Sequence, residues 1–244
     1  MHRCLILLLA TVVLAAADIP LHVATIPTER TDEDGRARHA ATLADPARAG
    51  AQVVFIGDSI TEMWGSEDAG RAVWGAVWKP LKALNLGVAG DRTEHVLWRI
   101  GHGALDGLQP RVVALMIGTN NAGQAHKDPA YRCTAAQQAD GTRAIVAEIR
   151  RRCPQAVILL HAILPRGDDV DPIRPQNEAA NALLKPLADG RTVRWIEFGQ
   201  RFFSPGTTDV NLGWCPDQLH LGPKAYRVWA DVLLPPVQEA LARR

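Results

Sequence analysis

The 244-residue sequence lacks an excess of charge of either sign, because 27 lysines and arginines stand against 26 acidic residues and leave a formal net charge of +1. A nucleic-acid-binding surface needs a basic field, so the composition argues against a nucleic-acid partner. Internal repeats and low-complexity runs are also absent from the sequence. With 47% apolar and 22% charged residues, the chain can bury a sizeable core and suits one α/β domain.

Long apolar runs are missing, except for one at the N-terminus. The run Cys4–Ala17 follows His2 and Arg3 and ends in the small residues Ala15-Ala16-Ala17. This is the pattern of a secretory signal peptide, here cleaved before Asp18, and it leads us to expect a secreted or periplasmic protein. The alternative is a membrane anchor, but the run of about 14 residues is shorter than the ~20 that span a bilayer. We therefore expect no stable membrane insertion.

Cysteine is scarce, and neither the cysteines nor the histidines have a metal-binding spacing. We therefore expect no metal and no cofactor. Cleavage of the leader would leave Cys133, Cys153 and Cys215, an odd number, so at least one thiol is free or pairs between chains. Cys133 and Cys153 flank a predicted helix that would hold its ends ~25–30 Å apart, so a bridge between them is not expected.

The body of the chain alternates between short apolar runs and helical patterns. Residues 18–50 are polar and irregular, with a short helix predicted at Arg36–Leu43. Five apolar runs predict buried strands: Gln52–Ile56, Leu84–Leu86, Val112–Ile117, Ala156–His161 and Thr192–Ile196. Four stretches predict helices: Thr93–Ile100, Thr134–Arg152, Gln176–Leu187 and Lys224–Leu241. Pro186 is expected to end the third helix early, and Pro235-Pro236 to bend the last one.

Strands that are apolar throughout and alternate with helices indicate a parallel sheet covered on both faces, hence a three-layer α/β/α sandwich with a five-stranded sheet. In such sheets the functional groups gather beyond the carboxyl ends of the strands. Three polar stretches directly follow predicted strands: Gly57-Asp58-Ser59, Gly87–Gly90 and Gly118–Asn121. These stretches are the first places to look for a site.

Ser59 lies at a strand-to-helix turn. Alone, it predicts an ordinary helix N-cap, and Glu62 three residues later fits a capping box. The same place would also let its backbone N–H stabilise a developing oxyanion. The stretch lacks the second glycine of the G-x-S-x-G elbow, which argues against an α/β-hydrolase.

A nucleophilic serine needs an imidazole to take its proton and a carboxylate to orient that imidazole. His220 and Asp217, three residues apart, could be delivered by one tight turn just before the last helix. The side chain of Asn120 and the backbone N–H of Gly90 could both donate hydrogen bonds to an oxyanion. Each piece alone also has a simpler interpretation. The Asp-His pair could belong to an ordinary surface turn, and the Asn120 side chain could hydrogen-bond to the backbone of its own turn.

Together the pieces resemble the SGNH/GDSL hydrolases. Four stretches look like the sequence blocks of that family, in the family's order: Val53–Glu62, Asn85–Asp91, Ile117–Asn121 and Asp217–Leu221. The resemblance covers about residues 51–235. It implies a flavodoxin-like sandwich with strand order 2-1-3-4-5, and a hydrolase domain at 51–244 after an N-terminal segment at 18–50. It also implies that Ser59 is the nucleophile, His220 the base and Asp217 its orienter, with an oxyanion hole formed by Ser59, Gly90 and Asn120.

Further stretches, His95–Ile100 and Leu164–Gly167, are similar to the catalytic subunits of platelet-activating factor acetylhydrolase of type Ib, as are Asn177 and Asn181. That resemblance suggests a homodimer. The chain departs from those subunits in its predicted signal peptide and in a loop predicted at Ala122–Cys133, which looks longer here. The substrate of those enzymes is therefore not carried over.

For the remaining polar and aromatic candidates we favour structural roles. Asp58 is expected to tie down the turn beside Ser59. Asn177 and Asn181 are expected to support the site from a helix face, and His161 to be a hydrogen-bonded core histidine. Trp214 fits either the core or a pocket wall.

The sequence thus predicts a serine esterase that cleaves short-chain, most simply acetyl, carboxylic esters through an acyl-enzyme. Its substrate would be a small-molecule or carbohydrate ester, because polar residues dominate the stretches Gly118–Asp128 and Arg166–Arg174. Two alternatives stay open. One is a lysophospholipase- or thioesterase-like lipid hydrolase, and the other is a catalytically idle carbohydrate-binding domain on the same fold.

Overall fold

The computed structural model describes residues 19–168 and 170–243, apart from the side chains of residues 125–127 and 129. The signal peptide predicted at residues 1–17 lies outside the described residues. The centre of the molecule is a parallel sheet of five strands in the order β2-β1-β3-β4-β5. The strands are β1 (Val53–Gly57), β2 (Ala83–Gly87), β3 (Val112–Met116), β4 (Val157–His161) and β5 (Val193–Ile196). The predicted sandwich, strand number and strand order are confirmed, and each strand boundary lies within one residue of its prediction.

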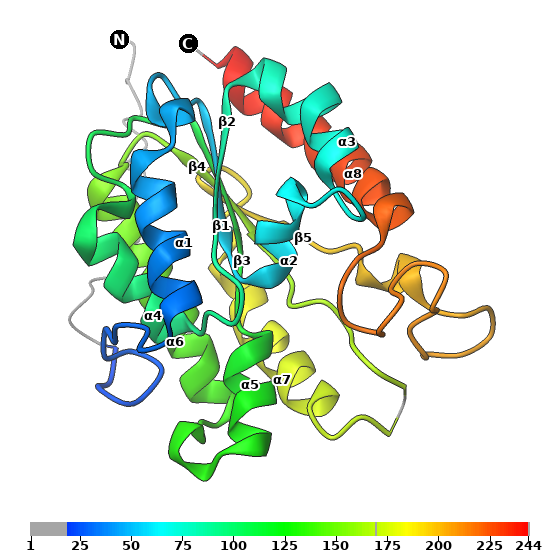
Figure 1. Cartoon of the computed structure of the whole chain (residues 1–244). Coiled ribbons are helices and arrows are strands. Elements are labelled where there is room, and N and C mark those ends of the chain that lie inside the picture. The colour runs from blue at the N-terminus through cyan, green and yellow to red at the C-terminus, as the bar shows by residue number, and fades with distance from the viewer. Residues whose placement is uncertain (1–18, 169, 244) are drawn as a thin grey trace, which may run out of the picture.

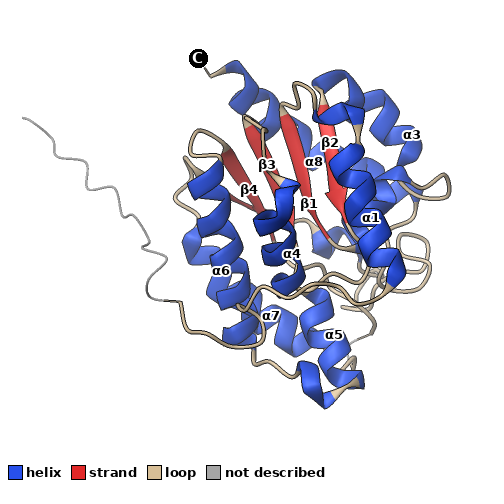
Figure 2. Cartoon of the chain, turned by 60° about the vertical axis from the view of Figure 1, so that its left-hand side comes forward, coloured by secondary structure: helices blue, strands red, loops and turns tan. Residues whose placement is uncertain are grey.

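Helices cover both faces of this sheet (Figure 1). On one side lie α2 (Ser59–Glu62), α3 (Arg71–Val73) and α8 (Pro223–Ala242). On the other lie α1 (Glu33–Ala44), α4 (Thr93–Arg99) and α6 (Ala135–Arg152). Figure 2 shows α5 (Thr119–Lys127) and α7 (Arg174–Leu184) beyond the end of the sheet to which the strands point. These two helices therefore flank the end where a site is expected.

The sheet separates two apolar clusters, because successive strand residues point to opposite faces. In β1, Val53 and Phe55 join the cluster beneath α8, while Val54 and Ile56 join the cluster beneath α4 and α6. All four side chains are at most 2% exposed. Burial on both faces explains why the strands read as continuous apolar runs rather than as an alternating pattern.

Most helices match their predictions, with caps that explain their ends. Asp32 accepts a hydrogen bond from the backbone N–H of Gly35 and starts α1 earlier than predicted. Thr134 and Gln137 form a capping box that starts α6. Helix α7 ends at Leu184, and a 3₁₀ turn follows at Lys185–Leu187, as Pro186 predicts. Pro235 and Pro236 both lie inside α8.

Two helical stretches contradict the sequence-based expectation or escape it. The predicted loop after Ala122 is wrong over its first half, because α5 occupies Thr119–Lys127. Its Asn- and Gly-rich sequence favours a loop, but tertiary contacts override that preference: the Asn121 side chain is 2% exposed and bonded to Thr93. The stretch from α3 through the π-helical turn Trp74–Trp78 was also not predicted.

Three further features of the described residues are their cysteines, their possible metal ligands and the apolarity of their helices. Cys133, Cys153 and Cys215 are free thiols in the described residues, as the distance argument for the first two predicts. No group of three or more possible metal ligands lies together among the residues described. None of the helices at 19–168 and 170–243 is long and apolar enough to cross a membrane.

An aromatic cluster fills the space between the sheet and α8. The ring of Phe55 lies 5.1–6.4 Å from the rings of Trp64, Trp74, Trp78 and Trp229, in edge-to-face arrangements. Trp64, Trp78 and Trp229 are at most 1% exposed, so these three rings belong to the core. Such pairs add to the stabilisation that burial itself provides.

Phe55→Ala is expected to lower the free energy of unfolding by about 3–5 kcal/mol, because it removes a fully buried ring and leaves a cavity. The measurement is urea denaturation, read as a shift of the midpoint at constant slope. Leu183→Ala, at a side chain that is 40% exposed, is the control and should change stability by no more than ~0.5 kcal/mol. Equal losses in the two variants would contradict the assignment of this cluster as the main core.

Candidate active site

Four segments bring polar groups to the carboxyl end of the sheet. Ser59 follows β1, Gly90 follows β2, and Asn120 follows β3 at the start of α5. Asp217 and His220 come from the turn that precedes α8. The structure therefore brings the residues predicted for the site to one end of the fold from places up to 161 residues apart.

Ser59, His220 and Asp217 form a continuous chain of hydrogen bonds. The Ser59 Oγ lies 2.9 Å from Nε2 of His220. On the other side of the ring, Nδ1 of His220 lies 2.6 Å from Oδ2 of Asp217. A carboxylate only accepts, so Nδ1 carries the proton and Nε2 is left as an acceptor for the serine hydroxyl. This is the tautomer that a general base requires.

The Asp217 carboxylate is fixed by its own turn. Its Oδ1 accepts hydrogen bonds from the backbone N–H groups of His220 (2.7 Å) and Leu219 (3.0 Å). Partial burial works to raise the pKa of Asp217, but the hydrogen bonds from the His220 ring and from these two N–H groups outweigh it and hold the pKa below its usual range. Asp217 is therefore a carboxylate near neutral pH and can accept the hydrogen bond from the His220 ring.

The turn between Asp217 and His220 is held from outside. Gln218 has a φ of +59°, in the left-handed region, and its carbonyl accepts a hydrogen bond from the N–H of Gly167 (2.9 Å). Arg174, 5% exposed, donates to the carbonyls of Arg166, Gly167 and Thr208. The turn that carries His220 thus rests on the loop after β4.

The prediction of Ser59 as an N-cap is wrong. Asp58 caps α2, since its Oδ1 accepts from the N–H of Ile60 (3.0 Å), and Ser59 is the first helical residue. Burial raises the pKa of Asp58 to about 7, against the opposing effect of the Ile60 N–H. Asp58 ties down the turn, as expected. Glu62 reaches away from the cap, and its Oε2 accepts from the N–H of Ala89 (2.6 Å).

Gly90 and Asn120 lie together beside this turn. Gly90 has a φ of +78°, which an L side chain rarely adopts, and its carbonyl accepts from Nε2 of Gln124 (2.9 Å). The Nδ2 of Asn120 donates to the carbonyl of Asp91 (3.0 Å). An amide nitrogen carries two hydrogens, so this bond orients the group and leaves one N–H for a ligand.

Sequence reasoning missed the groups behind this loop. Asp91 is fully buried, and its Oδ2 lies 2.7 Å from Nε of Arg99, which is itself 2% exposed. Arg99 also donates to the carbonyl of Leu86 (2.9 Å), at the end of β2. The available sequence signal was the placement of Arg99 three residues after Val96, on the apolar side of the predicted helix, because arginine is almost never buried without a partner.

Among the residues expected to be structural, the hydrogen bonds agree with that role. His161 is 2% exposed, its Nε2 accepts from the Trp229 indole (3.0 Å), and Nδ1 lies 3.1 Å from the Leu115 carbonyl. Asn181 bonds to both the N–H and the carbonyl of Ile163. Trp214 is partly buried and packs 6.0 Å from Phe202, on the core side.

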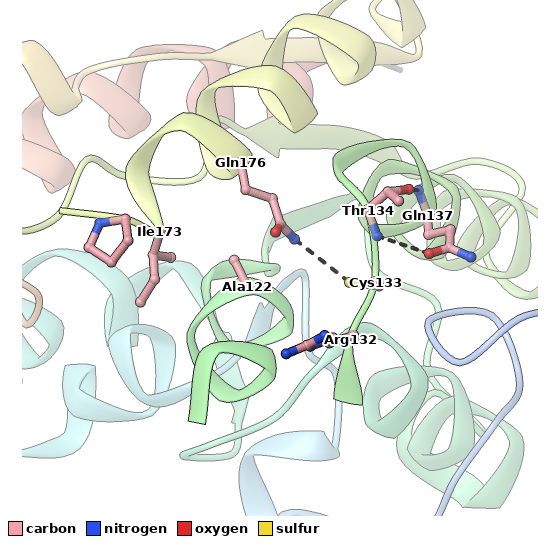
Figure 3. Close-up of a pocket in the computed structure, with 8 residues that line it drawn as sticks. Ala122, Arg132, Cys133, Thr134, Gln137, Ile173 and Gln176 are labelled. Atoms are coloured by element: carbon pink, nitrogen blue, oxygen red, sulfur yellow. Dashed lines mark hydrogen bonds between the residues drawn. The ribbon is translucent and has the colours of Figure 1, made fainter. Parts of the chain in front are cut away.

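A cavity of about 520 Å³ lies between α5, α6 and α7, and its lining includes none of the three residues of the hydrogen-bonded chain. Figure 3 shows Gln176 pointing toward Cys133 on its wall, with the Nε2 of Gln176 3.8 Å from Sγ. Burial raises the pKa of Cys133 to about 11, so this thiol stays protonated and is no nucleophile near neutral pH. The cavity is thus separate from the Ser59 site.

Comparisons with known proteins agree with this geometry. The alpha1 subunit of platelet-activating factor acetylhydrolase IB from Bos taurus is 36% identical over 166 residues, which make up 67% of this chain and 66% of that protein. The human alpha2 subunit is 39% identical over 133 residues, 54% of this chain and 52% of that protein. The alignments thus span two thirds or less of the length of these relatives.

Solved structures share the fold. A GDSL-like lipase from Bacteroides thetaiotaomicron has a TM-score of 0.66 at 18% identity, over 84% of this chain and 96% of that one. An acetylxylan esterase from Geobacillus stearothermophilus has a TM-score of 0.60 at 19% identity, over 77% and 94%. The model of the GDSL-like lipase/acylhydrolase family matches residues 55–228. The resemblance seen in the sequence is therefore confirmed: the chain belongs to the GDSL-like lipase/acylhydrolase family, a family of carboxylic ester hydrolases.

Proposed function

We propose that the chain hydrolyses short-chain carboxylic esters through a covalent acyl-enzyme on Ser59. The observation that carries the proposal is the unbroken chain from Ser59 Oγ to His220 Nε2 (2.9 Å) and from His220 Nδ1 to Asp217 Oδ2 (2.6 Å). A nucleophile, a base and an orienting carboxylate in this order are the parts of acyl transfer. A catalytically idle binding domain would have no use for this alignment.

In the first half of the reaction, the Ser59 Oγ attacks the ester carbonyl while His220 Nε2 takes the hydroxyl proton. The carbonyl oxygen becomes an oxyanion. The backbone N–H of Ser59, at the first position of α2, has no acceptor within the helix, and it would bind this oxygen together with the Gly90 N–H and the Asn120 amide. The tetrahedral centre then collapses, the C–O bond to the alcohol breaks, and the proton on His220 passes to the leaving alkoxide.

In the second half, water takes the place of the alcohol. His220 removes a proton from that water as its oxygen attacks the acyl carbon, and collapse of the second tetrahedral centre returns the proton to Ser59. The His220 side chain is 30% exposed and that of Asp217 is 56% exposed. The base is therefore open to solvent, which this step requires.

We further propose an acetyl group as the acyl part and a polar alcohol, such as a sugar, as the leaving group. Charged side chains surround the loop at Gly90: Arg30, Arg38 and Glu62 approach it and are 18%, 29% and 31% exposed. Such a rim favours hydrogen-bonding substrates over long acyl chains, which gain ~0.8 kcal/mol per CH₂ only against apolar walls. The similarity to proteins named as an acetylhydrolase and an acetylxylan esterase also supports this choice. Secretion, inferred from residues 1–17, would bring the enzyme to such substrates.

Ser59→Ala is expected to abolish turnover of p-nitrophenyl acetate, with a loss in kcat on the order of 10⁶, because a triad acts as a unit. His220→Ala should be similarly severe. Thermal melts of both variants would check that they are folded. Asp58→Asn is the matched control: asparagine caps a helix as well as aspartate, so most of the activity should remain. A folded Ser59→Ala protein with more than a tenth of the activity would overturn the proposal.

Asn120→Ala is expected to lower kcat by roughly 10²–10³ with little change in KM, because its free N–H serves the oxyanion rather than the ground-state substrate. Steady-state kinetics on p-nitrophenyl acetate separates the two constants. If KM rises and kcat does not move, Asn120 is a substrate-binding residue and the oxyanion assignment is wrong.

The acyl preference is tested with p-nitrophenyl esters of two to twelve carbons. We expect kcat/KM to be highest for acetate and to fall with chain length, since the charged rim offers no apolar wall to a longer chain. A maximum at eight carbons or more would favour the lipid hydrolase instead. Release of acetate from acetylated xylo-oligosaccharides, compared with acetyl phospholipids, then identifies the alcohol part.

A further inference from the structure

Arg30 belongs to the N-terminal segment that the sequence analysis set outside the hydrolase domain, yet its guanidinium reaches the loop at Gly90. Its Nη1 donates to the carbonyl of Ala89 (2.7 Å) and to Oδ1 of Asp91 (3.2 Å). One side chain thus holds the residues on both sides of Gly90. A Cβ added to Gly90 would lie 3.2 Å from both terminal nitrogens of Arg30, so the guanidinium packs directly against this glycine.

The bond to Ala89 has a direct consequence for the oxyanion hole. The carbonyl of Ala89 and the N–H of Gly90 belong to the same peptide unit, which is planar and trans, so they point in opposite directions. A donor that fixes the carbonyl also fixes the direction of the N–H. The positively charged guanidinium beside the carbonyl oxygen further polarises the peptide and makes its N–H a stronger donor.

Arg30 itself is held in place. Its Nε and Nη2 bond to Oδ2 (2.6 Å) and Oδ1 (2.9 Å) of Asp32, in the bidentate arrangement that suits a guanidinium and a carboxylate. Asp32 is also the N-cap of α1, and the hydrogen bond from Arg30 lowers its pKa to about 2. The carboxylate is therefore charged at any working pH, and the guanidinium is oriented before substrate binds.

Asn120 depends on the same contacts. Its Nδ2 donates to the backbone carbonyl of Asp91, whose side chain Arg30 binds. Two of the three proposed oxyanion donors, the Gly90 N–H and the Asn120 amide, therefore rest on a peptide or a residue that Arg30 contacts. The third, the N–H of Ser59, belongs to α2.

We infer that Arg30 is a positioning residue of the oxyanion hole: it holds and polarises the Ala89–Gly90 peptide whose N–H stabilises the transition state. The inference rests on the proposed function, because it presupposes Ser59 chemistry. It makes the N-terminal segment a working part of the hydrolase. Arg30 touches neither the substrate carbonyl nor the triad in this role, so its effect reaches the reaction only through the loop.

The first test is the steady-state kinetics of Arg30→Ala and Arg30→Lys on p-nitrophenyl acetate. Deleting an oxyanion donor outright costs roughly 10²–10³ in kcat, so loosening one is expected to cost about tenfold with KM within about twofold. Arg30→Lys keeps a cationic donor for the Ala89 carbonyl but loses the bidentate contact with Asp32. It should recover part of the lost kcat.

Arg48→Ala is the matched control. Arg48 lies in the same N-terminal segment and donates to the backbone carbonyls of Gly103, Ala104 and Asp106, at 2.9–3.1 Å, away from the loop at Gly90. Its loss should lower the melting temperature and leave kcat per folded molecule unchanged. If Arg30→Ala lowers kcat no more than Arg48→Ala, or raises KM alone, the inference is overturned.

A double-mutant cycle with Gly90→Ala tests the path of the effect. A Cβ at Gly90 strains a backbone held at a φ of +78° and pushes the guanidinium by a few tenths of an ångström. Arg30→Ala should therefore cost little more in the Gly90→Ala background. Multiplied losses in the double variant would mean that Arg30 acts elsewhere. Ser59→Ala separates the two levels: an active Ser59→Ala protein refutes the proposed function, whereas an inactive one beside a fully active Arg30→Ala protein refutes only the role of Arg30.

Discussion

The buried carboxylate of Asp91 is the constraint on which the site depends. It lies between two guanidinium groups, Arg99 at 2.7 Å and Arg30 at 3.2 Å, with no exposure of its own. Burial raises the pKa of Asp91 although both arginines oppose the shift, which shows that placing this carboxyl in the interior carries a desolvation cost. In return the carboxyl group fixes the geometry of the loop that carries Gly90. Arg99 connects this loop to α4 and to the end of β2, and Arg30 connects it to the N-terminal segment. Removing Asp91 would leave the buried Arg99 without a carboxylate, whereas removing Arg30 leaves the Asp91–Arg99 pair in place and releases only the N-terminal segment from the loop.

Ser59 and His220 are held in place in different ways. Ser59 stands at the end of β1, a fully buried interior strand of the sheet, and its turn is tied by the Asp58 cap. His220 comes from an irregular segment that owes its shape to local hydrogen bonds and to Gly167 in the loop after β4. The sheet therefore fixes Ser59, while a chain of loop contacts aims His220 at it.

How far the sequence predicts this arrangement follows from the range of the interactions. The strands were placed within one residue because apolar runs record burial on both faces, and the Asp217–His220 pair could be proposed because both residues share one turn. Helix α5 was missed because its Asn and Gly residues favour a loop, and only contacts with Thr93 and Gln138 reveal the helix. The ion pair of Arg30 and Asp91 spans 61 residues, and no local pattern encodes such a partner. Propensity and periodicity thus predict the frame, and long-range polar contacts decide its details.

The difference in burial between the two sides of the site has a chemical meaning. Behind the proposed oxyanion donors lie Asp58, Asp91 and Arg99, all at most 2% exposed. In such a low-dielectric environment fixed dipoles need not reorganise as charge develops. The base side is open, with His220 and Asp217 reachable by water. Deacylation needs a water molecule at the imidazole, and release of a polar alcohol needs an exit past it. An enclosed base would hinder both steps, and an exposed oxyanion hole would lose the advantage of preorganisation, so the proposed reaction favours a rigid, buried donor side and a solvent-accessible base.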